Sequence, residues 1–208
     1  VDPAETKGVE ADASGDSAAK PEPTNTADPD AQTLMGVLDG ITLPEDIDPE
    51  VIAQAFRTFR GLPHRLESVA TIAGIRFIND SKATNGEAAS QALSSFDDIY
   101  WIAGGIAKED SLSPALHCLD RVRHVYLIGE ASREFEAELT KHGVASTVSG
   151  DLAAALQDAT ADASADGLPA PVVLLSPACA SFDQYLNFAR RGDHFREIVM
   201  RSVGENAS

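Results

Sequence analysis

The feature of this chain that most constrains its fold is a repeated alternation, between residues 66 and 203, of short apolar runs with longer amphipathic stretches. Runs of four to six apolar residues, as in IYWIAGG, HVYLIG and VVLLSPACAS, are typical of strands buried on both faces of a sheet. The stretches between them, such as ASREFEAELTKHG with its closing Gly143, have helical spacing. Strands that alternate with helices indicate βαβ units, so we predict an α/β fold with a doubly wound, largely parallel sheet.

The remaining elements follow from the same patterns. Two strands, LESVATIAG and IRFIND, are expected on either side of Gly74, and a helix is expected from Asn85 to about Leu93. A further helical stretch is expected around Leu112 to Leu119, and the last helix is expected within QYLNFARRGDHFREIVMRSV. We place all of these elements in one domain, residues 60–204.

The N-terminal part of the chain has a different composition. Residues 1–30 contain almost no bulky apolar side chains, and such a segment cannot offset the entropy lost on ordering, so we predict a disordered acidic leader. Apolar residues return in residues 31–59, where PEDIDPEVIAQAFRTF has the spacing of an amphipathic helix. We interpret residues 31–59 as a helical linker segment.

The charge balance argues against two classes of partner. The chain has 16 basic and 33 acidic residues and a net charge of -17, which would repel both nucleic acid and anionic membranes. It also has no apolar run of about 18 residues and no basic-then-apolar N-terminal signal. We therefore expect a cytoplasmic protein without nucleic-acid or membrane partners.

Cysteine and histidine spacing gives no indication of a metal site. Cys118 and Cys179 are too few and too far apart for a disulfide framework or a C-x-x-C site, which fits a reducing compartment. The five histidines show no metal-ligand spacing. We expect no metal bound by this chain alone.

Three polar clusters follow predicted strands. They are NDSKATN at 79–85, GGIAKED at 104–110 and SPACAS at 176–181. Ligands of doubly wound sheets bind beyond the carboxyl ends of the strands. We therefore expect the three clusters to share one rim and one site.

The first cluster suits an anion. Lys82 supplies a compact cation, and Thr84 and Asn85 precede a predicted helix, whose first N–H groups also attract negative charge. The alternative is that Thr84 or Asn85 only caps the helix while Lys82 is solvated. The residues by themselves leave both interpretations open.

The other polar residues carry similar alternatives. Lys108 adds a second cation after paired glycines, although a Gly-Gly turn with an exposed lysine is common. Ser181 either caps the final helix or presents its hydroxyl to a ligand carboxylate. Arg65 either clamps a phosphate or is a solvated charge. No G-x-S-x-G, G-x-x-x-x-G-K-[ST] or G-x-G-x-x-G motif is present, which argues against a serine hydrolase and against tight nucleotide binding by this chain alone.

Four segments together resemble a known family. FRGLPHRLE, FINDSKATN, IAGGIAKED and LLSPACASFDQYLNFARRGDHF, in this order, resemble the C-terminal domain of the Mur ligases, and within that family its D-glutamate-adding members. The resemblance covers about residues 50–202. It implies a Rossmann-like domain that brings the incoming amino acid to a P-loop ATPase domain and to a domain that holds the UDP-sugar.

The resemblance also implies a reaction. ATP phosphorylates the carboxylate of UDP-N-acetylmuramoyl-L-alanine, the amine of D-glutamate attacks the acyl phosphate, and loss of phosphate leaves an amide in a peptidoglycan precursor. ATP and Mg²⁺ are the implied cofactors of the complete enzyme. Because this chain lacks the motifs of the other two domains, we expect it to be inactive alone.

The resemblance further implies roles for individual residues. The implied D-glutamate contacts are Lys82, Thr84, Lys108, Ser181, Phe182 and Phe188. The implied nucleotide contacts are Arg65 at the phosphates, Asp80 at the ribose, and Asn85. Two carboxylates on one substrate would account for two lysines and two hydroxyls at one rim.

Two other functions fit the same residues. The chain is alternatively a non-catalytic module that binds an acidic amino acid, or the domain of a related Mur or folylpolyglutamate-type ligase. The acidic leader favours a tether between domains over an independent sensor.

Overall fold

The computed structural model describes residues 49–58, 61–108 and 111–206, in two compact units, residues 1–59 and 60–208. The predicted leader at 1–30 and the first part of the 31–59 segment lie outside the described residues. In the first unit, α2 (Pro49–Thr58) forms inside the stretch that we predicted to be helical. Within the residues described here, no helix has the length and apolarity that a membrane crossing requires.

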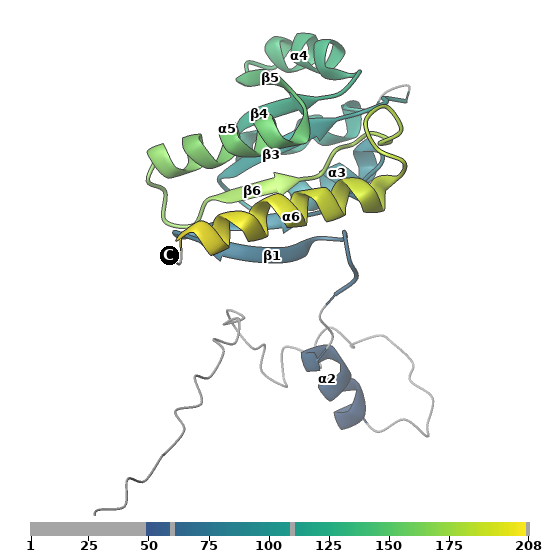
Figure 1. Cartoon of the computed structure of the whole chain (residues 1–208). Coiled ribbons are helices and arrows are strands. Elements are labelled where there is room, and N and C mark those ends of the chain that lie inside the picture. Colours follow the sequence, from purple (N-terminus) through teal and green to yellow (C-terminus); the bar gives the residue numbers. More distant parts are fainter. Residues whose placement is uncertain (1–48, 59–60, 109–110, 207–208) are drawn as a thin grey trace, which may run out of the picture. The chain divides into compact units, whose positions relative to one another are not determined.

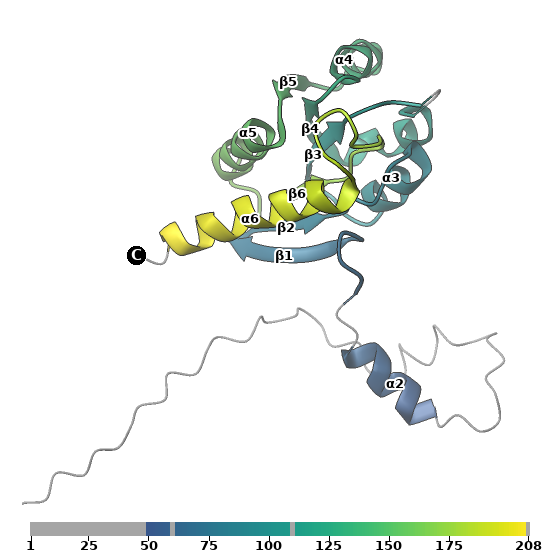
Figure 2. The same cartoon turned by 45° about the vertical axis from the view of Figure 1, so that its right-hand side comes forward.

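The second unit is built on one six-stranded sheet with the order β1-β2-β6-β3-β4-β5. The strands are β1 (Glu67–Ile72), β2 (Ile75–Asn79), β3 (Ile99–Gly104), β4 (Val122–Ile128), β5 (Ser146–Gly150) and β6 (Val172–Leu175). β1 pairs antiparallel with β2 across a tight turn in which Ala73 and Gly74 both have positive φ, and the other pairs are parallel. The predicted largely parallel α/β sheet is confirmed, and β1 and β5 form its two edges (Figure 2).

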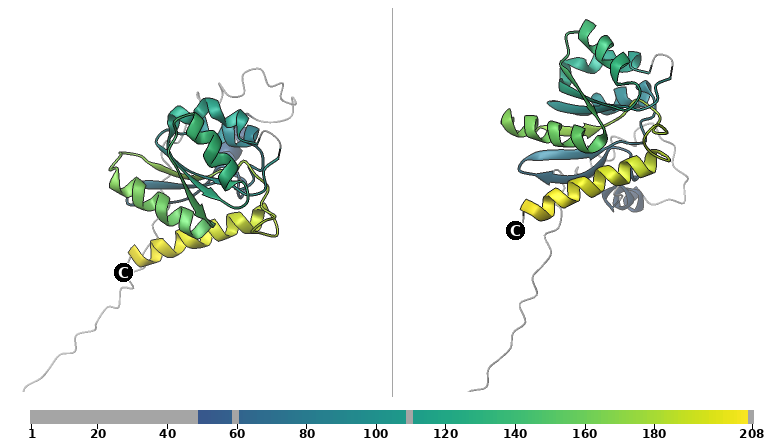
Figure 3. Two further views of the ribbon diagram at one scale, coloured as in Figure 1. Left: turned by 90° about the horizontal axis from the view of Figure 1, so that it is seen from above. Right: turned by 45° about the horizontal axis from the view of Figure 1, so that its top comes forward.

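Helices cover both faces of this sheet. They are α3 (Gly86–Leu93), the 3-10 helix η1 (Ser113–Arg121), α4 (Ser132–Lys141), α5 (Leu152–Ala165) and α6 (Phe188–Asn206). Figures 1 and 3 show α5 and α6, in light green and yellow, along one face. α3, η1 and α4 pack against the other, which makes three layers.

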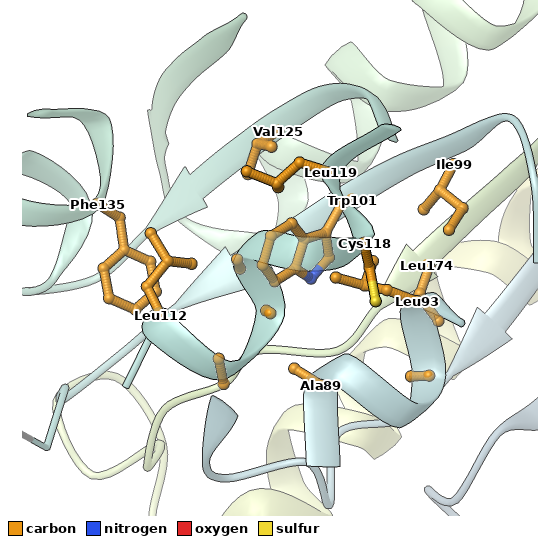
Figure 4. Close-up of a cluster of buried hydrophobic side chains, with 14 of the residues drawn as sticks. Ala89, Leu93, Ile99, Trp101, Leu112, Cys118, Leu119, Val125, Phe135 and Leu174 are labelled. Carbon is orange, nitrogen blue, oxygen red and sulfur yellow. The ribbon is translucent and has the colours of Figure 1, made fainter. Parts of the chain in front are cut away.

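Each face of the sheet has its own apolar core. Trp101 and Leu174 belong to the cluster that packs with α3, η1 and α4, and Figure 4 shows the Trp101 indole among these side chains. Their chain neighbours Ile102 and Leu175 belong to the cluster that packs with α5 and α6. Successive strand residues point to opposite faces, so burial of both faces requires the unbroken apolar runs of the sequence.

One predicted element differs in detail. The helical stretch expected at Leu112–Leu119 is a 3-10 helix at Ser113–Arg121, wound by i→i+3 hydrogen bonds such as Ala115 N–H to the Leu112 carbonyl, 2.9 Å. Short connectors commonly take this tighter form. η1 packs closely against α3, because a Cβ on Gly86 would lie 2.8 Å from Cδ of Pro114 in η1 and 2.2 Å from the carbonyl oxygen of Ser111 just before it.

Candidate functional site

The three polar clusters follow three neighbouring strands. Asn79 at the end of β2 pairs with Leu175 at the end of β6, and Leu175 pairs with Ile102 near the end of β3. These strands are parallel, so their carboxyl ends lie side by side at one edge of the sheet. The structure therefore brings the three polar segments together, as the sequence predicts.

The segments that follow β3 and β6 are joined to each other. Ile106 and Ala180 exchange two backbone hydrogen bonds of 2.9 and 3.1 Å, and Gly104 N–H donates to the Pro177 carbonyl at 2.9 Å. Gly105 permits this approach, since its φ is +131° and a Cβ there would lie 2.2 Å from the Ala180 oxygen. The segments that follow β3 and β6 are therefore in direct backbone contact with each other.

Asp80 joins the end of β2 to the end of β6. Its carboxylate accepts hydrogen bonds from the Ser176 hydroxyl at 2.9 Å and from Leu66 N–H at 3.2 Å. Burial raises the pKa of Asp80 to about 6, against the opposing effects of these hydrogen bonds and of nearby Arg65. Arg65 itself is exposed. The nucleotide contacts of both residues stay predictions.

Lys82 lies against the start of α6. Its ammonium is 4.2 Å from the centroid of the Phe188 ring, a cation–π arrangement, and its side chain is half-buried. The Ser81 hydroxyl donates to the Phe188 carbonyl at 2.7 Å, which fixes α6 beside this cluster. A lysine and an aromatic ring implied for the same substrate are therefore neighbours.

The other residues of the first two clusters are placed as follows. Asn85 caps α3, because its side-chain oxygen accepts from Ala88 N–H at 2.9 Å, so the capping interpretation is confirmed for Asn85. Thr84 is half-buried at the same turn. Lys108 is exposed, and its backbone forms a turn with the Ser111 hydroxyl.

Ser181 does not cap the final helix. Its carbonyl accepts from Gln184 and Tyr185 N–H, so the chain turns after Ser181 and α6 begins only at Phe188. Asn187 caps α6 instead, accepting from Arg190 N–H at 2.9 Å. The capping alternative for Ser181 is therefore wrong. Ser181 as a whole residue is 2% exposed.

The loop at residues 181–187 is held at several points. Asp183 accepts from Glu130 N–H at 3.1 Å, and Gln184 donates to the Gly150 carbonyl at 2.7 Å. These contacts tie the loop to the turns that follow β4 and β5. Phe182 meanwhile remains 70% exposed, so its side chain faces outward at the rim of the site.

Sequence reasoning missed Arg191. Its side chain is only 1% exposed and donates hydrogen bonds to residues of all three clusters. Burial lowers the pKa of Arg191 to about 10, which still leaves it protonated at neutral pH. A signal was available, because Arg191 precedes buried Phe195 by four residues and buried Val199 by eight, and therefore stands on the apolar stripe of α6.

The site also depends on buried His64 and Asn79. The Asn79 amide lies 3.1 Å from His64 Nδ1 and donates to the Gly192 carbonyl at 3.1 Å. His64 Nε2 lies 3.6 Å from an oxygen of Asp193. No group of three or more metal-ligating side chains occurs in the part of the chain that the structure covers.

Comparisons with known proteins agree with this architecture. The family model described as "Mur ligase, glutamate ligase domain" matches residues 64–179. The UDP-N-acetylmuramoylalanine–D-glutamate ligase of Nitrobacter hamburgensis is 50% identical over 155 residues, 74% of this chain and 33% of the relative. The ligase of the same name from Rhodospirillum rubrum is 52% identical over 156 residues, 74% of this chain and 32% of the relative.

The solved structure of the UDP-N-acetylmuramate–alanine ligase of Thermotoga maritima covers 83% of this chain and 37% of its own, with 14% identity and a TM-score of 0.49. This chain spans about a third of the length of the curated relatives that it matches. The family model covers more than half of the chain, including two of the three strand-end clusters completely and the third as far as Cys179. The chain therefore belongs to the Mur ligases and contains their glutamate ligase domain.

Proposed function

We propose that this chain is the C-terminal, D-glutamate-binding part of the cytoplasmic ATP-dependent ligase that joins D-glutamate to UDP-N-acetylmuramoyl-L-alanine in peptidoglycan precursor synthesis. The observation that carries the proposal is the identity of about 50% to ligases named for that product, over three quarters of this chain. The convergence of two lysine-bearing clusters with Ser181 at one edge of the sheet supports it.

D-Glutamate suits the chemistry of this edge. Its two carboxylates need cations and hydroxyl donors, and we assign Lys108 and Thr84 to one and Ser181 to the other, with Lys82 adding positive field. Lys82, which is half-buried, and Ser181, which is buried, lie on segments that internal contacts hold in place. A preorganised site would hold the amine in line with the acyl phosphate and so replace a bimolecular encounter.

The nucleotide would approach the same edge from the Arg65 side. We assign Arg65 to the phosphates and Asp80 to the ribose hydroxyls, and Asp80 is mostly ionised at neutral pH, as an acceptor requires. ATP supplies the phosphoryl group that activates the alanyl carboxylate. We assign Mg²⁺ to the phosphates of ATP, because Mg²⁺ at nucleotides is held by phosphate oxygens together with one or two carboxylates.

Binding by the isolated chain tests the proposal directly. We expect weak binding of D-glutamate, weaker binding of L-glutamate and no release of phosphate from ATP. Calorimetry and NMR titration with both enantiomers, beside a phosphate-release assay, measure these outcomes. Equal affinity for the two enantiomers would contradict the assignment, and turnover of ATP by the pure chain would contradict the dependence on other domains.

A chimera tests the site residues in a complete enzyme. Residues 60–208 would replace the matching third of the Rhodospirillum rubrum ligase. We expect Lys82→Ala and Ser181→Ala each to lower kcat/KM for D-glutamate by about tenfold or more, because Ser181→Ala removes a hydrogen bond to a carboxylate and Lys82→Ala removes a cation that attracts both carboxylates. Lys141→Ala, an exposed lysine paired with Glu138 on α4, is the matched control and should leave the kinetics unchanged. Wild-type kinetics for both site variants would remove the assignment.

A further inference from the structure

The guanidinium of Arg191 contacts all three strand-end segments at once. It donates to the Ser81 hydroxyl at 3.1 Å, the Ser81 carbonyl at 3.0 Å, the Cys179 carbonyl at 3.1 Å and the Gly104 carbonyl at 3.4 Å. Ser81 follows β2, Cys179 follows β6 and Gly104 ends β3. These segments are up to 98 residues apart in the sequence, so one side chain fixes their mutual register.

Each acceptor stands close in the chain to an assigned substrate residue. Ser81 directly precedes Lys82, and Cys179 precedes Ser181 by two residues. Gly104 precedes the loop that carries Lys108. A shift of the guanidinium would therefore move the backbone beneath each proposed substrate contact.

Burial of the charge of Arg191 lowers the stability of the fold, so a contribution to stability does not explain this residue. Among the residues that the structure describes, no carboxylate forms an ion pair with Arg191. Its hydrogen bonds go only to carbonyl and hydroxyl oxygens, and Asp183 contributes a favourable charge from a greater distance. Arg191 also stands in the first turn of α6, where the helix dipole disfavours a cation. Violations of local rules such as these are expected at functional sites.

We propose that Arg191 is the positioning residue of the D-glutamate site, which holds the three segments in register and places a fixed positive charge beneath the bound carboxylates. This inference rests on the proposed function. Arg191 is 1% exposed, so we assign it a role through the three segments and no direct contact with the substrate. The planar guanidinium can donate to several carbonyl oxygens at fixed angles. An ammonium at the same position keeps the charge but lacks this planar arrangement of N–H donors.

Hydrogen exchange measures the positioning role without any ligand. In the 208-residue chain, we expect Arg191→Lys to speed amide exchange at Ile106 and Ala180 by about tenfold, since the ammonium cannot reproduce all the hydrogen bonds that the guanidinium donates to the three segments. Amides of the central sheet such as Leu127 and Leu174 should exchange as in the wild type. Unchanged exchange at Ile106 and Ala180, or equal acceleration throughout the sheet, would overturn the proposal.

Ligand affinity gives the second measurement. We expect the dissociation constant for D-glutamate, measured by NMR titration, to rise about tenfold in Arg191→Lys and further in Arg191→Met, which also removes the charge. Tyr126→Phe is the matched control, because it removes a hydrogen bond to Asp162 at the α5 face. It should lower stability without changing affinity, and equal losses of affinity in Tyr126→Phe and Arg191→Lys would overturn the proposal.

One further variant, together with the pattern of the two measurements, separates the possible failures. If both Arg191 variants fail to fold, Ser81→Ala removes the hydroxyl that accepts from Arg191 and donates to Phe188, and the same exchange pattern is expected at Ile106 and Ala180. If wild-type chain binds no D-glutamate, the proposed function fails while the exchange data still decide the role of Arg191 as a brace. If D-glutamate binds and exchange is unchanged, only the inference about Arg191 fails.

Discussion

At the scale of single residues, burial changes the chemistry of the polar groups at the strand ends. Nothing in the local sequence indicates an unusual pKa for Asp80, but burial raises its pKa to about 6. The same physical cause lowers the pKa of Arg191 to about 10. In both cases burial removes water from the charged side chain, so the free energy of the charged form depends on the hydrogen bonds that the protein provides.

The raised pKa of Asp80 predicts a pH dependence of stability. Between pH 3.8 and 6 the folded state binds a proton that the unfolded state releases, so the free energy of unfolding falls as pH rises through this window. The expected fall is about 3 kcal/mol at most, and Asp80→Asn should lack it. Urea unfolding of both proteins at pH 4, 5, 6 and 7 measures the difference. A wild-type chain that gains stability over Asp80→Asn as pH rises would contradict this sign.

The contact between Lys82 and Phe188 gives a second residue-scale prediction. Phe188→Leu removes the ring beneath the ammonium, and we expect D-glutamate affinity to fall about two- to fivefold, in line with a cation–π interaction of about 0.5–1 kcal/mol. Ring-current shifts of the Lys82 ε-methylene protons report the contact in NMR spectra. Phe188→Tyr keeps the ring and should preserve both the shifts and the affinity, so a loss equal to that of Phe188→Leu would count against the role of the ring.

At the scale of elements, the two glycines of α6 have different surroundings, since one lies against a buried side chain and the other does not. Gly192 lies against the ring of His64, and a Cβ there would come within 2.2 Å of His64 Nδ1. That ring is buried and held by Asn79 and Asp193, so it has little freedom to move. For Gly204, on the same helix, no described atom outside the neighbouring helix backbone lies within 4 Å of the position of a Cβ.

We therefore predict that alanine at these two positions changes the free energy of unfolding in opposite directions. We expect Gly192→Ala to lower the free energy of unfolding by about 1–3 kcal/mol through overpacking. Gly204→Ala should raise it by up to about 1 kcal/mol, because alanine is the better helix former. Urea titrations measure both. If the clash with the ring is the cause, His64→Ala should reduce the cost of Gly192→Ala, and strictly additive effects would rule that cause out.

At the scale of the whole molecule, both apolar clusters belong entirely to residues 60–208. The second unit therefore has its own core on each face of the sheet, and the single tryptophan, Trp101, lies in one of them. Trp101 also donates to the Ser176 carbonyl at 2.7 Å, which joins the core to the strand-end edge. Its fluorescence thus reports on the fold that positions the site.

We predict that residues 60–208 fold without residues 1–59. A protein that begins at Arg60 should unfold in one transition, at a midpoint within a few degrees of that of the full chain, because it keeps every residue of the two apolar clusters that the structure describes. Trp101 fluorescence and circular dichroism measured together test for one transition. A much lower midpoint, or two transitions that do not coincide, would show that residues 1–59 stabilise the domain.

Much of this protein was determined by its sequence alone, because the decisive signals are local. Short unbroken apolar runs located most strands, a spacing of about 3.6 residues located most helices, and Asn85 was recognised as a possible cap from its place before a helix. The position of polar residues directly after strands predicted a shared edge. The 3-10 form of η1 and the late start of α6 after Ser181 were not visible in these patterns, since both depend on packing.

Only the tertiary structure decided which strands are neighbours and which polar groups are buried. β6, the last strand in the chain, lies between β2 and β3, and this placement brings Ser176 to Asp80 and Cys179 to Arg191. The pKa of Asp80 and the four hydrogen bonds of Arg191 follow from that order. Such properties depend on contacts between residues about 10 to 110 positions apart, and no local pattern in a single sequence specifies them.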